Sequence, residues 1–287
     1  MGVVGGGVVA ALHQNHERLS ELVGRPVDIK RVLVRDTARQ RSREISPELL
    51  TTNVEDVLGD PEVDIVVEVL GGQDPALDYI LRGISQGHHI VTANKEVVAR
   101  HGPTILGKAR EKGVQVLFEA TVAGGTPIIA PLLRDLVANE IIAIHGIING
   151  TTNYILTRMA QDGAGFEETV DEARRLGYAE ADPTSDIEGI DAACKLAILA
   201  TLAFRTRVED SDVYREGIRK IKVRDFLYAH ELGYTIKLLA IADYRDGGIQ
   251  ARVHPTMVPD DMIIAKVDGV ESPEAIPFTI LLPAFVT

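Results

Sequence analysis

The stretch at residues 63–112 decides the fold class: VDIVVEVLGGQDPALDYILRGISQGHHIVTANKEVVARHGPTILGKAREK. Two short apolar runs, at residues 63–70 and 89–92, flank a segment with helical spacing at 75–86. A proline at the start of that segment and a glycine after its end suit the boundaries of a helix. Strands that are apolar on both faces and alternate with helices are typical of a parallel sheet covered on both sides. The stretch therefore predicts an α/β fold with a doubly wound parallel sheet.

The same alternation extends over the first part of the chain. Further strands are expected at residues 27–35 and 114–119, and further helices at 8–23 and 94–112. Each run is short and rich in Val and Ile, as buried parallel strands are. We therefore place a first domain of this class at residues 1–126.

From residue 127 the regular alternation ends. A polar turn at residues 149–153 is expected to open a helix, and Asp246-Gly247-Gly248 is expected to join two strands as a β-hairpin. Other helices are predicted at 127–138, 166–176 and 190–204, and strands at 140–148, 234–244 and 249–254. This pattern predicts a second, α+β domain at residues 127–287.

The composition excludes several classes of function. Among the 287 residues, 30 are basic and 42 are acidic, which gives a net charge of -12. Such a chain is a poor candidate for binding nucleic acid or an anionic membrane, and it contains no apolar run long enough to span a bilayer. The single cysteine, Cys194, permits no internal disulfide and fits a reducing compartment. We expect a cytoplasmic protein with no nucleic-acid or membrane partner.

A glycine cluster at the N-terminus predicts dinucleotide binding. Gly2-Val3-Val4-Gly5 resembles the last part of the Rossmann fingerprint G-x-G-x-x-G, with Gly2 as its second glycine and Gly5 as its third. Glycines at these positions let the backbone approach a pyrophosphate at a helix N-terminus. The first glycine and its strand are absent, so a flexible glycine-rich start stays an alternative. The first domain is thus interpreted as an NAD(P)-binding, Rossmann-like domain.

The predicted strand at residues 27–35 ends at Arg35, which bears on the choice of cofactor. An NAD site usually has Asp or Glu there for the ribose 2′-hydroxyl, whereas Arg accommodates a 2′-phosphate. Arg39, Arg41 and Arg43 follow and make the segment basic. The pattern favours NADP over NAD, although a solvated charged loop is a second interpretation.

A lysine stands in an otherwise apolar helix at residues 191–204. An unpaired buried ammonium group is costly, so Lys195 needs a partner or a task. Asp191 lies four residues earlier on the same helical face. Burial generally lowers the pKa of an ammonium group, which favours proton transfer. The spacing therefore predicts either a structural ion pair or a reaction site.

Four acidic residues lie in a loop just before that helix, at residues 178–188. Glu180 and Asp186 are among them. An acidic loop is usually solvated, but it can also bind the ammonium group of an amino-acid substrate. Both interpretations stay open on the spacing alone.

Five motifs in this order resemble the homoserine dehydrogenase family. They are TANK at residues 92–95, FEATVAGGTP at 118–127, NGTTNYIL at 149–156, GYAEADP at 177–183 and DAACKL at 191–196. The resemblance runs from Gly2 to about Val270. It implies NAD(P)-dependent interconversion of L-homoserine and L-aspartate 4-semialdehyde in threonine, methionine and isoleucine biosynthesis. Arg35 favours NADP as the cofactor, with NAD possible.

The resemblance also implies roles for individual residues. Lys195 matches the proton donor, with Asp191 beside it, and Lys95 matches a second lysine near nicotinamide and substrate. Glu180 matches the glutamate that binds the substrate amino group, and Asp186 is placed with it. The implied cofactor-binding residues are Gly2, Val3, Val4, Gly5, Arg35, Leu70, Gly71 and Lys95.

A sodium site is implied as well, at Glu119, Val122, Gly124 and Thr126, built largely from backbone carbonyls. A tight turn between a strand and a helix is the other interpretation of that segment. The family further implies a homodimer or homotetramer that assembles through the second domain.

Set against this family, the chain is expected to be shortened at both ends. A strand is expected before Gly2 at the centre of the parallel sheet, so two neighbouring strands should lack a partner. Residues 271–287 do not resemble the family, and its glycine-rich return to the cofactor domain is missing. No room remains for an aspartate kinase or an ACT domain, so threonine feedback through such a domain is not expected.

A second class of function stays open on the sequence. The incomplete glycine motif is also consistent with a catalytically impaired dinucleotide-binding paralogue that acts as a binding or regulatory module. The complete set of Lys95, Glu180, Asp191 and Lys195 argues against decay of the reaction site. Weak cofactor binding or instability is expected in the first domain.

Overall fold

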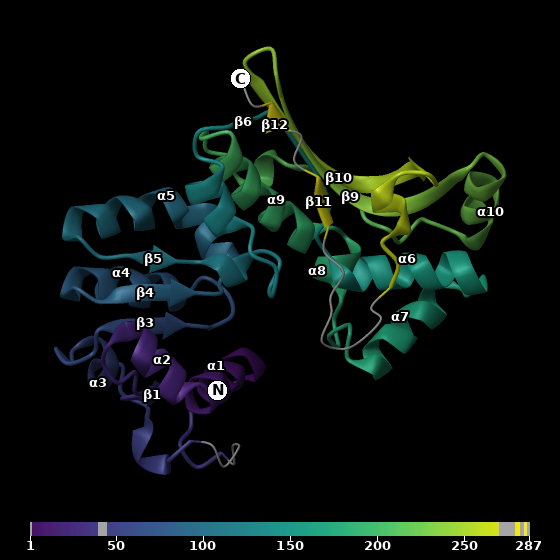
Figure 1. The fold of residues 1–287 in the computed structure, drawn as a ribbon. Coiled ribbons are helices and arrows are strands. Elements are labelled where there is room, and N and C mark those ends of the chain that lie inside the picture. Colours follow the sequence, from purple (N-terminus) through teal and green to yellow (C-terminus); the bar gives the residue numbers. More distant parts are fainter. Residues whose placement is uncertain (1, 40–44, 270–278, 282–283, 286–287) are drawn as a thin grey trace. The chain divides into compact units, whose positions relative to one another are not determined.

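A computed structural model describes residues 2–39, 45–269, 279–281 and 284–285 of the chain (Figure 1). The chain divides into two compact units. Unit 1 comprises Met1–Val97 and His101–Phe118, and unit 2 comprises Val98–Arg100 and Glu119–Thr287. The main division thus falls after residue 118, whereas the motifs placed it after residue 126. None of the helices in the described ranges is long and apolar enough to cross a membrane.

The strands of unit 1 form two parallel sheets. A three-stranded sheet has the order β3-β4-β5, and β1 pairs with β2 in a second sheet. These strands are β1 (Val32–Leu33), β2 (Leu50–Thr51), β3 (Ile65–Glu68), β4 (His89–Thr92) and β5 (Val116–Leu117). Parallel pairing throughout confirms the predicted α/β class. Strand β1 covers only two of the nine residues predicted as a strand.

Helices α4 (Ala76–Gln86) and α5 (Lys95–Lys112) of unit 1 begin and end within one residue of the predicted positions. The short helix α3 (Glu55–Leu58) and the 3-10 turn η1 (Pro47–Leu49) were not predicted from the sequence. The side chain of Asn94 accepts a hydrogen bond from Val97 N and caps α5. Gly87 ends α4 at φ +95°, in the left-handed region that glycine enters without steric cost.

The hydrophobic core of unit 1 lies on one face of the three-stranded sheet. Val66 and Ile90 pack there with Ile80, Ile84 and Ile105 from α4 and α5. On the opposite face the side chains of Ile65, Val67 and Leu117 are 52%, 41% and 47% exposed. The helices therefore cover one face of these strands more completely than the other.

The N-terminal helix begins earlier than predicted and is broken once. Residues 8–23 were expected to form one helix, whereas α1 (Val3–Gln14) and α2 (His16–Val23) meet at Asn15. Asn15 has a non-helical backbone, and its side-chain amide donates to Ala11 O at 2.9 Å. Because asparagine competes with the backbone for hydrogen bonds in this way, it favours helix ends over helix interiors.

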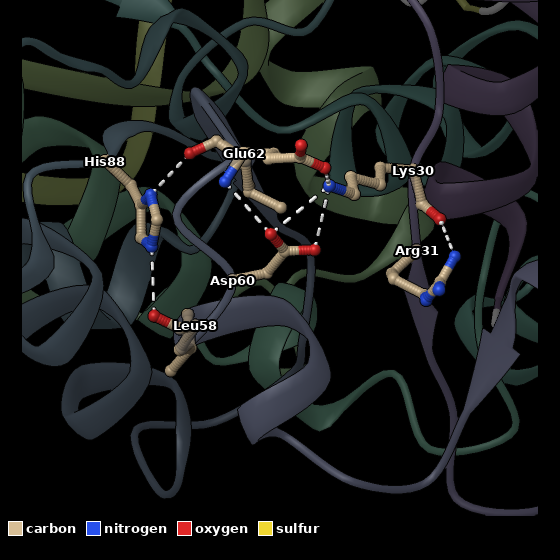
Figure 2. A network of polar contacts seen from close by, with 7 residues as sticks. Lys30, Arg31, Leu58, Asp60, Glu62 and His88 are labelled. Atoms are coloured by element: carbon tan, nitrogen blue, oxygen red, sulfur yellow. Dashed lines mark hydrogen bonds and ion pairs between the residues drawn. The ribbon is translucent and has the colours of Figure 1, made fainter.

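A polar network holds the loop that leads into β3 (Figure 2). Lys30 Nζ lies 3.0 Å from the carboxylate of Asp60 and also pairs with Glu62. These two acids raise the pKa of Lys30, whereas hydrogen bonding from the Glu62 backbone and from Lys30 lowers the pKa of Asp60. The charge of Lys30 is thus paired with two carboxylates of unit 1.

His88 is a core residue of unit 1. It is buried, its Nδ1 lies 2.6 Å from Val63 O, and its Nε2 lies 3.0 Å from Leu58 O (Figure 2). Both ring nitrogens therefore face backbone oxygens of the same loop.

Unit 2 is built on a five-stranded mixed sheet of order β11-β7-β9-β10-β8. The strands are β7 (Ala143–Ile147), β8 (Tyr214–Arg215), β9 (Tyr234–Arg245), β10 (Gly248–Pro259) and β11 (Thr279–Leu281). A separate pair joins β6 (Glu140–Ile141) to β12 (Ala284–Phe285). The predicted hairpin is confirmed: β9 and β10 are antiparallel, and the turn at Asp246 and Gly247 has positive φ at both residues.

Five α-helices of the described residues accompany this sheet, and α9 packs against β9 and β10. They are α6 (Gly150–Asp162), α7 (Phe166–Leu176), α8 (Thr184–Ile187), α9 (Ile190–Ala203) and α10 (Val223–Glu231). The predicted helix at 127–138 is largely replaced by a π-helical turn, η3 (Pro131–Asp135). The remaining 3-10 turns are η2 (Glu119–Thr121), η4 (Asp210–Asp212) and η5 (Ile263–Lys266).

Candidate active site

Helix α9 places Lys195 and Asp191 together. Lys195 Nζ lies 2.8 Å from Asp191 Oδ2, one helical turn away. Asp191 is buried, whereas the side chain of Lys195 is 20% exposed. The pair therefore lies at the boundary of the core, where a buried carboxylate holds an ammonium group that solvent still reaches.

A second acceptor fixes the ammonium group from another part of unit 2. Lys195 Nζ donates to Ile148 O at 3.1 Å, just after β7. An ammonium group carries three hydrogens. Within the described residues two acceptors are found for Lys195, so the group retains donor capacity for a bound oxygen.

Asn149 joins this pair to a second aspartate. Its Nδ2 donates to Asp191 Oδ2 at 2.9 Å and to Asp186 Oδ1 at 2.6 Å. Its Oδ1 accepts from Thr152 N at 2.8 Å and so caps α6. Asn149 was not predicted as a site residue from the sequence. The signal available was an asparagine in the polar turn before a predicted helix.

Asp186 lies on α8 in a partly buried setting. Burial raises the pKa of its carboxyl group, and the neighbouring Asp191 acts in the same direction. Hydrogen bonds from Asn149 and Thr151 and the charge of Lys195 act to lower that pKa. The site thus holds two carboxylates and one ammonium group, which suits binding of a zwitterionic ligand.

The other acids of the 178–188 loop have separate roles. Glu180 is exposed, and no hydrogen bond or ion pair connects it to Lys195 within the described part of the chain. Asp182 accepts from Thr184 at the start of α8, and Glu188 pairs with Arg219 at 2.8 Å. Of these four acids, Asp186 alone makes a hydrogen bond to Asn149. Binding of the substrate amino group by Glu180 stays a prediction.

In unit 1, the predicted cofactor residues Leu70, Gly71 and Lys95 lie at the carboxyl ends of β3 and β4. Asn94 Nδ2 donates to Leu70 O at 3.3 Å and to Gly72 O at 2.7 Å, and Lys95 begins α5 directly after it. The carboxyl ends of parallel strands are where α/β proteins bind ligands. The loop and the lysine are therefore held at one edge of the sheet.

A buried carboxylate supports that edge. Glu68 Oε1 accepts from Leu70 N at 2.6 Å, and Glu68 Oε2 accepts from Thr92 Oγ1 at 2.6 Å. Thr92 Oγ1 in turn accepts from Asn94 N at 3.0 Å. Hydrogen bonds of Glu68 on β3 and Thr92 on β4 thus connect the loop after β3 to the segment after β4.

The remaining cofactor candidates of unit 1 are mostly exposed. Gly2 caps α1 in an extended conformation, Val3 and Val4 are exposed, and Gly5 is buried. Arg35 is exposed two residues after β1. Arg41 and Arg43 lie outside the described residues. The first turn of α1 leaves backbone N–H groups without helical acceptors, as a phosphate site requires.

The candidate sodium segment forms a tight turn. Thr126 N donates to Ala123 O at 2.8 Å, and Val122 is buried while Gly124 is exposed. The Glu119 carboxylate accepts three backbone N–H groups, from Ile128, Ile129 and Ala130, at 2.6–2.8 Å. In the ranges that the structure describes, no group of three His, Cys, Asp or Glu side chains could hold a metal ion.

Comparisons with known proteins assign both parts of the chain to one family. The family model "Homoserine dehydrogenase, NAD binding domain" matches residues 1–119, and "Homoserine dehydrogenase" matches residues 127–278. The homoserine dehydrogenase of Synechocystis sp. is 49% identical over 274 residues, which cover 94% of this chain and 63% of that relative. The chain thus spans less than two thirds of the length of this curated relative.

Solved structures show the same likeness. The crystal structure of a homoserine dehydrogenase from Thiobacillus denitrificans has a TM-score of 0.89 and 46% identity, covering 99% of this chain and 64% of that one. A hyperthermophilic archaeal homoserine dehydrogenase in complex with NADPH has a TM-score of 0.69 and 27% identity, covering 83% of this chain and 67% of that one.

Proposed function

The chain belongs to the homoserine dehydrogenase family, and on this premise we propose that it interconverts L-homoserine and L-aspartate 4-semialdehyde with a nicotinamide cofactor. The observation that carries the proposal is the contact of Lys195 with Asp191 and Ile148 O, beside Asp186 and Asn149. The reaction belongs to threonine, methionine and isoleucine biosynthesis, which implies a cytoplasmic enzyme.

Lys195 is the proposed acid and base. A bound nicotinamide cofactor would supply hydride chemistry at the aldehyde carbon, in either direction. In reduction, the electron pair of the C=O π bond moves to oxygen, and Lys195 donates a proton to that oxygen. In oxidation, the neutral amine of Lys195 accepts the hydroxyl proton. In reduction, the positive charge of the Lys195 ammonium group also stabilises the developing alkoxide, because that group is already in place.

The amino-acid end of the substrate is proposed to meet the acidic residues of unit 2. Asp186 and Glu180 provide carboxylates for its ammonium group, and Lys95 is proposed to act beside nicotinamide and substrate. Asp191 is proposed to orient Lys195, because its carboxylate is buried and lies in direct contact with the ammonium group.

NADP is the proposed cofactor. The polar edge at the carboxyl ends of β3 and β4 suits it, because Asn94 bonds to Leu70 O and Gly72 O on either side of Gly71, and Glu68 accepts from Leu70 N. Lys95 follows Asn94 at the start of α5. The first turn of α1, from Gly2 to Gly5, provides backbone N–H groups for the pyrophosphate. Arg35 is proposed to bind the 2′-phosphate, and NAD is expected to bind more weakly.

Sodium is proposed to bind through backbone carbonyls of Val122, Gly124 and Thr126. Glu119 fits a supporting role better than a ligand role, because three backbone N–H groups already engage its carboxylate. A carboxylate bound in this way holds the turn in shape.

The proposal is tested by assaying the full chain for NADPH-dependent reduction of aspartate 4-semialdehyde and for homoserine oxidation. A parallel titration of NADPH fluorescence measures binding, and light scattering tests the proposed homodimer or homotetramer. Turnover in both directions supports the function. NADPH binding without turnover would overturn it in favour of a non-catalytic dinucleotide-binding module.

A further inference from the structure

We propose that Asn149 is a positioning residue that holds Asp186 and Asp191 together as one carboxylate pair beside Lys195. The inference rests on the proposed function, since it names a further residue of the same site. In the hydrogen bonds of the described residues, the Asn149 side chain donates to the two aspartates and accepts from Thr152. Its effect on the reaction would therefore pass through the carboxylates.

The orientation of the Asn149 amide is set by its other end. Thr152 N can only donate, and it lies 2.8 Å from Asn149 Oδ1. The carbonyl oxygen must therefore face Thr152, which leaves the NH₂ group facing the carboxylates. A flipped amide would place its carbonyl oxygen, an acceptor, against the acceptor oxygens of Asp186 and Asp191, and an N–H against a backbone N–H. The cap on α6 thus determines that the NH₂ group of Asn149, and not its carbonyl oxygen, faces the two aspartates.

One NH₂ group satisfies two carboxylates at once. Its two hydrogens are donated to different residues, to Asp186 Oδ1 at 2.6 Å and to Asp191 Oδ2 at 2.9 Å. Asn149 is buried, so water does not readily replace these bonds. The amide therefore fixes the spacing between α8, which carries Asp186, and α9, which carries Asp191.

The charges explain why a neutral donor is needed there. Asp186 faces Asp191 and Lys195 from α9 and the donors Asn149 and Thr151 from α6. Burial and Asp191 favour its protonated form, whereas the two donors and Lys195 favour its carboxylate. Loss of the Asn149 bonds would raise the pKa of Asp186 further. A protonated Asp186 would no longer attract a substrate ammonium group.

Two substitutions separate the helix cap from the contact with the carboxylates. Asn149→Ser keeps an oxygen that can cap α6 but provides a single hydroxyl hydrogen. Asn149→Asp keeps the cap and the shape of the side chain, but it replaces the NH₂ group with an oxygen of a third carboxylate. Asn153→Ser is the matched control, because Asn153 is a buried asparagine on the same helix that donates to Val267 O instead.

The first readout is the pH dependence of kcat/KM for homoserine. Asn149→Ser is expected to lower kcat/KM by about 10-fold at neutral pH and to move the acidic limb to higher pH. Asn149→Asp should lower it further, because it adds a like charge. Asn153→Ser should reduce thermal stability and leave the acidic limb in place. An unchanged acidic limb in Asn149→Ser would overturn the proposal.

The second readout needs neither turnover nor a substitution. In the wild-type chain, NMR of the Asn149 side-chain amide should show a chemical-shift change that follows the titration of the Asp186 carboxyl carbon. Asn149 amide chemical shifts that stay constant over this titration would overturn the positioning role, even if the variants do not fold. Absence of turnover in the wild-type chain would overturn the proposed function alone, because the NMR titration still decides the role of Asn149.

Discussion

The candidate residues of the two units are held in different ways. In unit 2, Lys195, Asp191 and Asp186 are joined through side chains to each other or to Asn149. Asp191 and Asn149 are buried, and Lys195 and Asp186 are partly buried. In unit 1, the cofactor candidates are exposed side chains, glycines and a loop held by its backbone. Removing one member of a connected buried group leaves the others unpaired, whereas exposed contacts fail one at a time. Substitutions in unit 2 are therefore expected to have larger and less additive effects.

The sheets show the same contrast. Eight consecutive residues of β9 are buried, from Ile236 to Asp243. In unit 1, β3 exposes Ile65 and Val67 on one face. Because fewer apolar contacts give a lower local opening free energy, unit 1 is expected to be the less stable of the two.

The largest expected effect is at Lys195. Lys195→Ala should lower kcat by about 1,000-fold, because it removes the proton donor from the proposed site. Lys237→Ala is the matched control, since Lys237 is a buried lysine of the same unit that pairs with Asp268 at 3.0 Å, outside the site. Both variants should lose stability, so kcat is measured where thermal unfolding shows both to be folded. Equal losses of kcat would remove Lys195 from its catalytic role.

A smaller effect is expected at Arg35 in unit 1. Arg35→Ala should weaken NADPH binding by about 10-fold and leave NADH binding nearly unchanged, because only NADPH carries the 2′-phosphate. The control is Arg31→Ala, an exposed arginine of the same segment that donates to Lys30 O. Fluorescence titrations with both cofactors give the two dissociation constants. The same loss for NADH as for NADPH would argue against recognition of the phosphate.

Glu180 tests whether an exposed acid contributes to the buried site. Glu180→Gln should raise the KM for homoserine about fivefold and leave kcat unchanged, as expected for one exposed charge that contacts substrate. Glu188→Gln provides the comparison, because Glu188 lies in the same loop but pairs with Arg219. Steady-state kinetics with homoserine at saturating NADP distinguishes them. A KM equal to that of the wild type would exclude Glu180 from substrate binding.

The smallest effect concerns stability at Asp186. Burial raises the pKa of its carboxyl group in the folded state, so ionisation costs folding free energy as the pH rises through that value. Asp186→Asn should therefore be more stable at neutral pH, by about 1 kcal/mol. The gain should vanish below about pH 4, where the unfolded carboxyl is also protonated. Urea unfolding at several pH values measures it, and a variant that is less stable at neutral pH would contradict the sign.

Local sequence signals predicted the elements that local chemistry determines. Helix α7 and strand β4 have the predicted bounds, since each is defined by its own apolar spacing and, for α7, by a terminal glycine. The Lys195–Asp191 contact was predicted for the same reason, because four residues along a helix bring two side chains to one face. The break at Asn15 was missed because its side-chain hydrogen bond competes with an otherwise helical pattern.

Tertiary structure alone decided the partners of those residues. Asn149 is 37 residues from Asp186 and 42 from Asp191 along the chain, and Ile148 is 47 residues from Lys195. Periodicity fixes the direction of a side chain within its own helix or strand, but it carries no information on which distant element packs opposite. That choice follows from how α6, α8 and α9 pack in unit 2. A buried amide and a buried carboxylate are stable only where each has a hydrogen-bond partner.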